Sequence, residues 1–191
     1  MIACTGYNST IMQALAMRRP EEVIEKITAD PAPIKMDCEF SWSHKAERFV
    51  LAAGVLHQKP LLDQSHSDIV SSVSINLINA ARLIETILHR VPNAHVAVIG
   101  SQSGNSGSYD MTYALCKSAL HQFVRWRKVS ADQVLVCIAP PIIADSGMTR
   151  RRKDYPSVLQ ERRTVQAMDV AALVEKALWF TPAGTVAIWD L

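Results

Sequence analysis

Several features are missing from this sequence, and each absence excludes a class of protein. None of its apolar runs approaches the roughly 20 residues that span a bilayer, so we expect no transmembrane helix and no membrane partner. The net charge is only +2, which gives no reason to expect nucleic acid as a partner. The first residues lack the basic stretch that opens a signal peptide, so the cytoplasm is the default location.

Cysteine and metal-binding patterns are equally sparse. The four cysteines are scattered and contain no CxxC pair, and the six histidines form no HExxH motif and no Cys/His cluster. Isolated cysteines in such a chain are more often small buried apolar residues than disulfide partners. We therefore expect a reducing compartment, no disulfide and no metal site at Cys4, Cys38, Cys116 or Cys137.

Short apolar runs alternate with segments of helical periodicity along the whole chain. The runs predict strands at 2–4, 22–28, 34–36, 49–54, 95–100, 134–139 and 185–189, and the periodic segments predict helices at 11–17, 68–90, 112–128 and 168–180. Such alternation predicts an α/β fold: a three-layer, Rossmann-like, doubly wound parallel sheet of six or seven strands. The 191 residues suit one well-buried domain, 1–191.

Four residues that follow predicted strands mark one edge of the expected sheet. In open parallel sheets, ligands bind in the crevice at the carboxyl ends of the strands. The sequence therefore predicts a binding site at this edge, around Gly6, Gly54, Ser101 and Pro140.

Tyr113 and Lys117 carry the strongest chemical signal. Their spacing of four places both side chains on one helical face, about one turn apart. An ordinary tyrosine pKa is about 10, and a neighbouring ammonium lowers it, which makes the phenol a usable acid or base. Ser101 ends the preceding strand, where its hydroxyl would hold a substrate oxygen beside the phenol.

Together these residues resemble the signature of the short-chain dehydrogenase/reductase family, a Tyr-x-x-x-Lys helix preceded by a serine about a dozen residues earlier. Ser101 lies twelve positions before Tyr113, and Ser103 is the competing candidate. Three further segments resemble family motifs in the right order: the turn after the fourth strand, the asparagine of the next long helix and the Pro-Gly segment near the nicotinamide. These are 51–54, 75–77 and 139–143.

The resemblance implies an NAD(P)-dependent oxidoreductase that transfers hydride between nicotinamide and a carbonyl or secondary alcohol. Tyr113 would be the acid or base, and Lys117 would lower its pKa and bind the nicotinamide ribose. Ser101 would orient the reacting oxygen, and Asn76 would anchor a proton-relay water. The implied cofactor contacts are Thr5, Gly6, Ser9, Thr10, Asp37, Ala52, Ala53, Gly54, Tyr113, Lys117, Pro140 and Ile143.

The nucleotide loop departs from the family pattern Thr-Gly-x-x-x-Gly-x-Gly, because Thr10 and Met12 replace the second and third glycines. Backbone N–H groups at the helix start can still meet a phosphate, helped by the Ser9 and Thr10 hydroxyls, but Met12 makes close approach harder. The alternative is therefore a non-catalytic binding or regulatory protein that keeps the fold. A sugar-nucleotide epimerase or dehydratase is a third possibility, with little room for its second domain.

Cofactor type, substrate loop and assembly rest on weaker signals. Arg18 and Arg19 would attract a 2′-phosphate, which gives a slight preference for NADP over NAD. The basic run 150–153 falls where the family carries its lid-like substrate loop. The helices of Asn76 and Tyr113 are those that pair across subunits in the family, which implies a homodimer or homotetramer.

Overall fold

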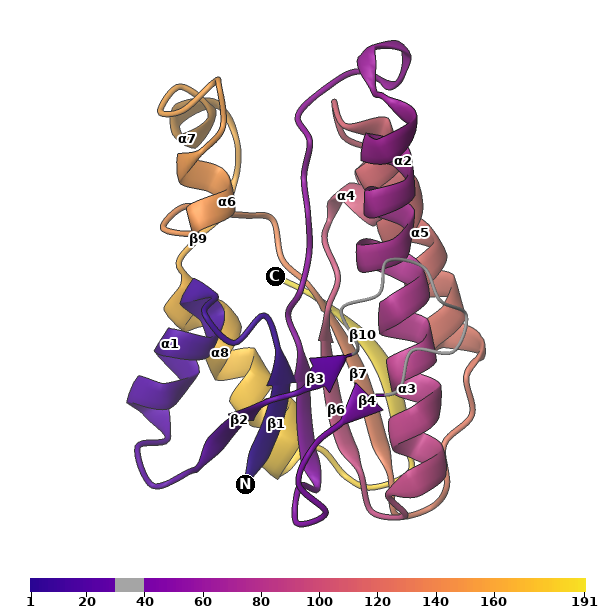
Figure 1. The fold of residues 1–191 in the computed structure, drawn as a ribbon. Helices are drawn as coiled ribbons and strands as arrows, with labels where there is room; N and C mark the ends of the chain where they lie inside the picture. Colours follow the sequence, from indigo (N-terminus) through magenta and orange to yellow (C-terminus); the bar gives the residue numbers. More distant parts are fainter. Residues whose placement is uncertain (30–39) are drawn as a thin grey trace.

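The computed structural model describes residues 1–29 and 40–191. Its centre is a six-stranded, wholly parallel sheet with the strand order β10-β7-β6-β5-β1-β2 (Figure 1). The predicted Rossmann-like α/β class is confirmed. The six strands are β1 (Ile2–Thr5), β2 (Ile24–Lys26), β5 (Arg48–Leu51), β6 (His95–Ile99), β7 (Val134–Ala139) and β10 (Thr185–Asp190).

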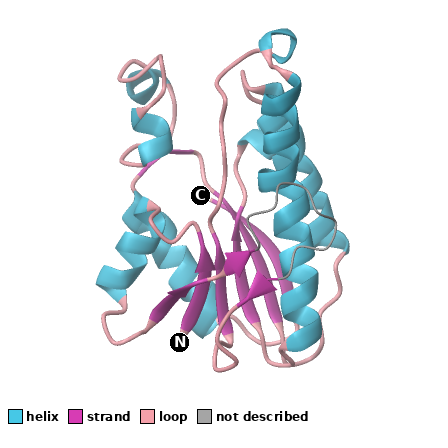
Figure 2. Cartoon of the chain, viewed as in Figure 1, coloured by secondary structure: helices cyan, strands magenta, loops and turns pink. Residues whose placement is uncertain are grey.

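Helices cover both faces of this sheet (Figure 2). One face packs against α1 (Thr10–Arg18) and α8 (Ala167–Glu175), and the other against α3 (Asn79–Arg90) and α5 (Met111–Trp126). The helix α2 (His66–Val73) packs against α5. Successive strand residues point to opposite faces, so Ala3 belongs to the second core cluster and Cys4 to the first. This double cover explains why the strands are near-continuous apolar runs, as in β7, where every residue is buried.

The long helix predicted at 68–90 is one continuous helix with a change of winding in the middle. A capping box of Ser65 and Asp68 starts α2, a π-helical segment follows at Ser74–Ile78, and α3 completes the helix. The π segment contains Asn76, the residue predicted to act in a proton relay. Such single-turn π segments are frequent at functional sites.

Short elements were missed in the sequence, because they contain too few residues to show a periodicity. They are the antiparallel pair β3 (Thr28–Ala29) and β4 (Phe40–Ser41), the parallel pair β8 (Ile142–Ile143) and β9 (Thr164–Val165), the helices α4 (Ser103–Ser106), α6 (Gly147–Arg150) and α7 (Val158–Glu161), and a 3-10 turn (Leu61–Asp63). The helix predicted at 168–180 is α8 continued by a π segment (Lys176–Phe180). The strand predicted at 34–36, together with Asp37 and Cys38, lies outside the described residues.

The strand order contains one reversal, which locates the ligand crevice expected of this architecture. From β1 the chain runs outward to β2 and then returns to β5 on the other side of β1. The crevice at such a reversal lies outside the carboxyl ends of β1 and β5.

Cys4, Cys116 and Cys137 are buried free thiols, as predicted. Across 1–29 and 40–191, no helix combines the length and apolarity needed to cross a membrane.

Candidate functional site

The loops after β1 and β5 touch at this reversal point. Gly6 has a φ of +66°, and a Cβ atom there would lie 2.7 Å from the carbonyl carbon of Ala52. The Ala53 N–H donates a hydrogen bond to Thr5 Oγ1 over 3.3 Å. Gly6 is therefore needed both for the left-handed backbone and for the close approach of two chains, which is the role expected of the first glycine of a nucleotide loop.

The start of α1 shows what replaces the other two glycines. Ser9 caps the helix by accepting a hydrogen bond from the Met12 N–H over 3.3 Å, and Thr10 is the first helical residue. Met12 is only 2% exposed and belongs to the apolar core cluster that includes Leu15. Because its side chain packs in the core, Met12 does not fill the crevice beside Gly6.

Ser101, Tyr113 and Lys117 come together at the same edge of the sheet. The Ser101 hydroxyl lies near enough to the Tyr113 phenol to lower the pKa of Tyr113 by hydrogen bonding. The Lys117 Nζ atom lies 5.7 Å from the centroid of the Tyr113 ring and donates to the Ile99 carbonyl over 2.8 Å. Ser103 instead donates its backbone N–H to Ser101 Oγ over 3.1 Å, so Ser101 is the serine at the phenol.

The pKa of Tyr113 is shifted in the direction opposite to the one predicted from the sequence. Burial raises the pKa of Tyr113, and the Asp110 carboxylate raises it further, while the hydrogen bond from Ser101 opposes both. Burial also lowers the pKa of Lys117 to about 8. The predicted lowering of the tyrosine pKa is therefore wrong for the ligand-free protein, because loss of solvent around the phenol outweighs any effect of the ammonium.

The side chain of Asn76 links the turn after β5 to the long helix through hydrogen bonds. Its Oδ1 accepts from the Val55 N–H over 3.0 Å, and its Nδ2 donates to the Val55 carbonyl over 2.9 Å and to Ser72 Oγ over 3.1 Å. A Cβ atom on Gly54 would approach Asn76 Oδ1 to 3.2 Å. The side chain of Asn76 is thus engaged within the protein, and its part in a water relay stays a prediction.

The remaining predicted contacts divide between this edge and the opposite one. Pro140 follows β7 and accepts a hydrogen bond from the Gln102 N–H over 2.9 Å, and Ile143 lies in β8 beyond it. Arg18 and Arg19 end α1 and both pair with Glu175 of α8, with contacts of 2.7 Å and 2.8 Å. These arginines lie at the far end of α1 from Gly6, so they give no support to a 2′-phosphate site.

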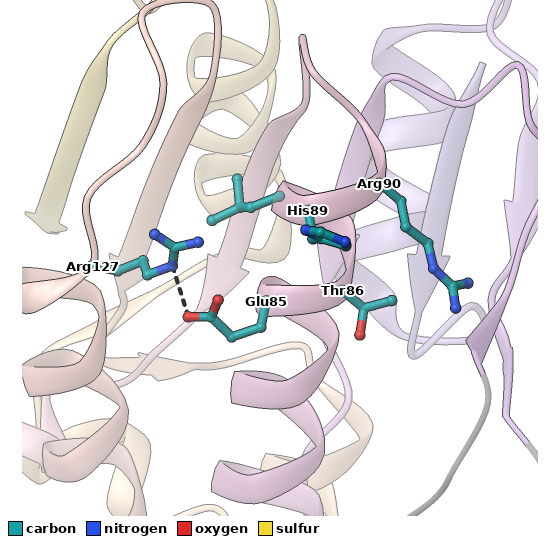
Figure 3. A pocket seen from close by; sticks show the side chains of 6 residues that line it. Glu85, Thr86, His89, Arg90 and Arg127 are labelled. Atoms are coloured by element: carbon teal, nitrogen blue, oxygen red, sulfur yellow. Dashed lines mark ion pairs between the residues drawn. The ribbon is translucent and has the colours of Figure 1, made fainter.

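A cavity of about 300 Å³ lies under the ends of β1, β5 and β6, and its lining includes Thr5, Ala53 and Lys117. The other side chains around it are mostly apolar. A second, open hollow of about 570 Å³ lies at the carboxyl ends of α3 and α5, where Arg127 pairs with Glu85 over 2.7 Å (Figure 3). None of the predicted site residues lines that second hollow.

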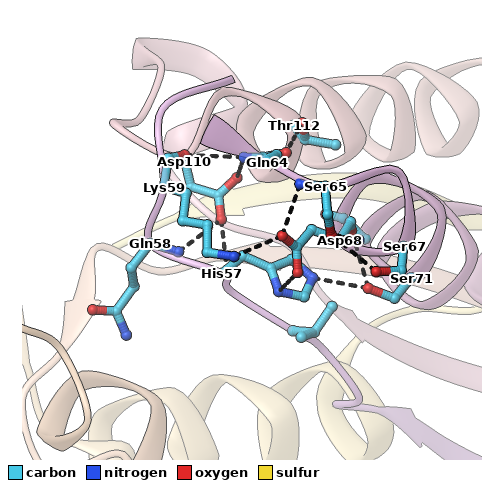
Figure 4. Close-up of polar contacts among 12 residues, drawn as sticks. His57, Gln58, Lys59, Gln64, Ser65, Ser67, Asp68, Ser71, Asp110 and Thr112 are labelled. Atoms are coloured by element: carbon cyan, nitrogen blue, oxygen red, sulfur yellow. Dashed lines mark hydrogen bonds and ion pairs between the residues drawn. The ribbon is translucent and has the colours of Figure 1, made fainter. Parts of the chain in front are cut away.

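Two buried polar residues of the site were missed in the sequence. His121 follows Lys117 by one more turn, is 1% exposed and accepts a 3.5 Å hydrogen bond from the Ser101 N–H. Asp110 is 1% exposed and caps α5 by accepting from the Tyr113 N–H over 3.1 Å. It also accepts from Gln64 Nε2 over 2.9 Å (Figure 4). The i+4 spacing after Lys117 and the acidic residue three before Tyr113 are the signals that point to them.

Comparison with solved structures identifies proteins that have the same fold as this chain. A short-chain dehydrogenase/reductase from Brucella melitensis matches with a TM-score of 0.73 at 17% identity, over 99% of this chain and 94% of that one. A 3-oxoacyl (acyl-carrier-protein) reductase from Agrobacterium tumefaciens matches with a TM-score of 0.73 at 15% identity, over 100% and 92%. The chain has the short-chain dehydrogenase/reductase fold.

An NADPH-bound actinorhodin polyketide ketoreductase has the same fold, with a TM-score of 0.73, 14% identity and coverage of 100% and 95%. The A. tumefaciens reductase was solved with NADP bound. No known family profile matches the sequence, and no curated protein matches it either.

Proposed function

We propose that this protein is an NAD(P)-dependent oxidoreductase that interconverts a carbonyl and a secondary alcohol. The observation that carries the proposal is the cluster at the crevice: the Ser101 hydroxyl lies near the Tyr113 phenol, and the Lys117 ammonium lies 5.7 Å from the centroid of the Tyr113 ring. Three such groups at the carboxyl edge of a parallel sheet supply an oxygen-binding hydroxyl, a proton donor and a fixed positive charge.

The nucleotide loop keeps features that fit a dinucleotide, although Thr10 and Met12 replace two glycines of the family pattern. Gly6 lets the backbone approach closely, and the start of α1 offers N–H groups beside the hydroxyls of Ser9 and Thr10. Thr5 and Ala53 border the neighbouring cavity. When bound, the nicotinamide supplies or accepts the hydride.

The protein's own residues would handle the oxygen and the proton. The raised pKa keeps the Tyr113 phenol protonated near neutral pH, which is the form that donates a proton to a carbonyl oxygen. Ser101 would hold that oxygen beside the phenol. Lys117, with a pKa of about 8, stays largely charged at neutral pH and would stabilise the phenolate that remains. In these protonation states, Tyr113 would be the proton donor when a carbonyl is reduced.

The neighbours with bound cofactor support a nicotinamide dinucleotide and favour NADP over NAD. Arg18 and Arg19 no longer contribute to that preference, since both are paired with Glu175. Lys26 is an exposed basic residue at the carboxyl end of β2, the strand end that meets the adenosine ribose in this architecture.

We also propose a homo-oligomer assembled through α5 and the adjoining long helix. Three large apolar side chains stand exposed there: Ile78 at 46%, Met111 at 44% and Leu115 at 60%. Exposed apolar groups on neighbouring helices are typical of subunit interfaces.

The competing proposal, a non-catalytic binding protein with this fold, rests on Thr10 and Met12, which occupy the positions of two family glycines. The two proposals differ in whether a reduced nicotinamide is consumed. A panel of aldehydes and ketones, tested with NADPH and NADH, separates them.

Tyr113→Phe and Tyr109→Phe form a matched pair for that assay, since Tyr109 is 70% exposed. We expect Tyr113→Phe to lower kcat by about 100-fold or more, which is the usual contribution of a positioned acid, and to leave the cofactor Kd unchanged. Tyr109→Phe should turn over like the wild type. Equal turnover of the two variants would remove the assignment of Tyr113.

A further inference from the structure

Gln58 joins the loop after β5 to the segment that lies between β8 and β9. Its Nε2 donates to the Arg151 carbonyl over 3.2 Å, and its Oε1 accepts from the Lys153 N–H over 3.0 Å. The carboxamide thus spans two backbone groups of a segment more than 90 residues away. In Figure 1, this segment, with α6 and α7, stands beyond the carboxyl edge of the sheet.

The backbone of Gln58 is strained, and a buried carboxylate holds it in place. Its φ is +58°, the one positive value recorded for a non-glycine residue among 1–29 and 40–191. A side chain disfavours this conformation, which persists only where the surroundings impose it. Here the N–H groups of His57 and Gln58 both donate to Asp110 Oδ2, over 2.8 Å and 3.2 Å.

The other oxygen of Asp110 faces the catalytic helix (Figure 4). Oδ1 accepts from the Tyr113 N–H over 3.1 Å and from Gln64 Nε2 over 2.9 Å. Four N–H groups from three parts of the chain therefore converge on one carboxylate that is 1% exposed. Charge-assisted hydrogen bonds of this kind are among the stronger ones in proteins, so the Asp110 carboxylate ties the loop firmly to the first turn of α5.

We propose that Asp110 and Gln58 form a bracket that couples the position of the segment 144–163 to the placement of Tyr113. The Gln58 side chain is hydrogen-bonded to the segment, and the Asp110 carboxylate accepts a hydrogen bond from the backbone of Gln58. The same carboxylate caps the first turn of α5. Asp110 is then a positioning residue. Only the catalytic role of Tyr113 rests on the proposed function. The coupling between the segment 144–163 and the first turn of α5 follows from hydrogen bonds within the fold.

The first test is native-state hydrogen exchange of the full chain, read by mass spectrometry in two peptides: the segment 144–163 and the first turn of α5. Gln58→Ala removes both side-chain hydrogen bonds to the segment. We expect exchange to rise about fivefold or more in the segment, the effect of losing ordinary hydrogen bonds, and to rise measurably in the first turn of α5 as well. Trypsin cleavage at the exposed residues Arg150 and Arg151 should accelerate in parallel.

Gln58→Gly and Gln160→Ala control this experiment. Gln58→Gly removes the same bonds and relieves the strained φ, so it keeps the test valid if the alanine variant is unstable. Gln160 is an exposed glutamine of α7, and Gln160→Ala should leave both peptides unchanged. Faster exchange confined to the segment, or in neither peptide, would overturn the coupling.

The second test is a double-mutant cycle with Asp110→Ser. Serine also caps helices well, so this variant keeps a partner for the Tyr113 N–H while releasing the backbone of His57 and Gln58. If the two residues act through one linkage, the effects of Gln58→Ala and Asp110→Ser on trypsin cleavage are not additive. Additive effects would contradict the bracket.

Turnover separates this inference from the proposed function. If carbonyl reduction is detected, Gln58→Ala should lower kcat and leave the Kd of NADPH unchanged, because it displaces Tyr113 and not the nucleotide loop. If no cofactor binds, the proposed function fails, whereas the exchange and cleavage measurements still decide the coupling.

Discussion

Replacing Lys117 with methionine should stabilise the protein near pH 7. Each pKa unit is worth about 1.36 kcal/mol. The fall from 10.5 to about 8 therefore means that the native fold disfavours the Lys117 ammonium by about 3 kcal/mol. The variant loses the 2.8 Å hydrogen bond to the Ile99 carbonyl, a loss of about 1 kcal/mol. We expect a net gain of about 2 kcal/mol in the free energy of unfolding.

The stability gained by Lys117→Met depends on pH, because the native and unfolded states lose the Lys117 proton at different pH values. Between about pH 8 and pH 10.5, the unfolded chain binds the Lys117 proton while the native protein has lost it. Wild-type stability therefore rises with pH through this window relative to the variant. The advantage of Lys117→Met should be full below about pH 8 and should disappear as the pH approaches 10.5.

Urea unfolding at both ends of this window measures the difference. Lys128→Met is the matched control, because Lys128 is exposed just beyond α5 and should change stability by less than about 0.5 kcal/mol. A Lys117→Met variant that is less stable than the wild type, by an amount independent of pH, would refute the reasoning. It would mean that the fold accommodates the ammonium at no cost.

Three other substitutions test separate parts of the structure. Gly6→Ala should lower the free energy of unfolding by about 2 kcal/mol or more in urea titrations, because the left-handed backbone and a Cβ atom 2.7 Å from Ala52 both oppose it. Asn76→Ala should cost about 2–3 kcal/mol in the same assay, since it leaves both backbone groups of Val55 without their partner. Leu115→Glu should shift the mass measured by light scattering to that of a monomer, and an unchanged mass would contradict the proposed interface.

Local periodicity in the sequence predicted the six strands of the central sheet, the long helices and the placement of Tyr113 and Lys117 on one helix. The prediction for β7 agrees residue for residue, since six consecutive buried apolar residues leave no other assignment. The edge that carries the site followed as well, because the ends of parallel strands meet at one edge.

What the sequence did not predict depends on contacts between distant segments. The burial that lowers the pKa of Lys117 comes from packing around the sheet, and three of the four N–H groups that donate to the Asp110 carboxylate lie 46 to 53 residues away along the chain. The prediction that Lys117 lowers the pKa of Tyr113 considered the charge and omitted the loss of solvent. Likewise, the ion pairs of Arg18 with Glu175 join residues 157 positions apart.

Titration of the protein with NADPH and NADH, followed by the fluorescence of the reduced nicotinamide, tests the central claim most directly. We predict saturable binding of at least one of the two, since Gly6 and the start of α1 still present backbone to a phosphate. If neither dinucleotide binds at about millimolar concentration, where the binding free energy is only about 4 kcal/mol, the oxidoreductase proposal is wrong and the fold serves another purpose.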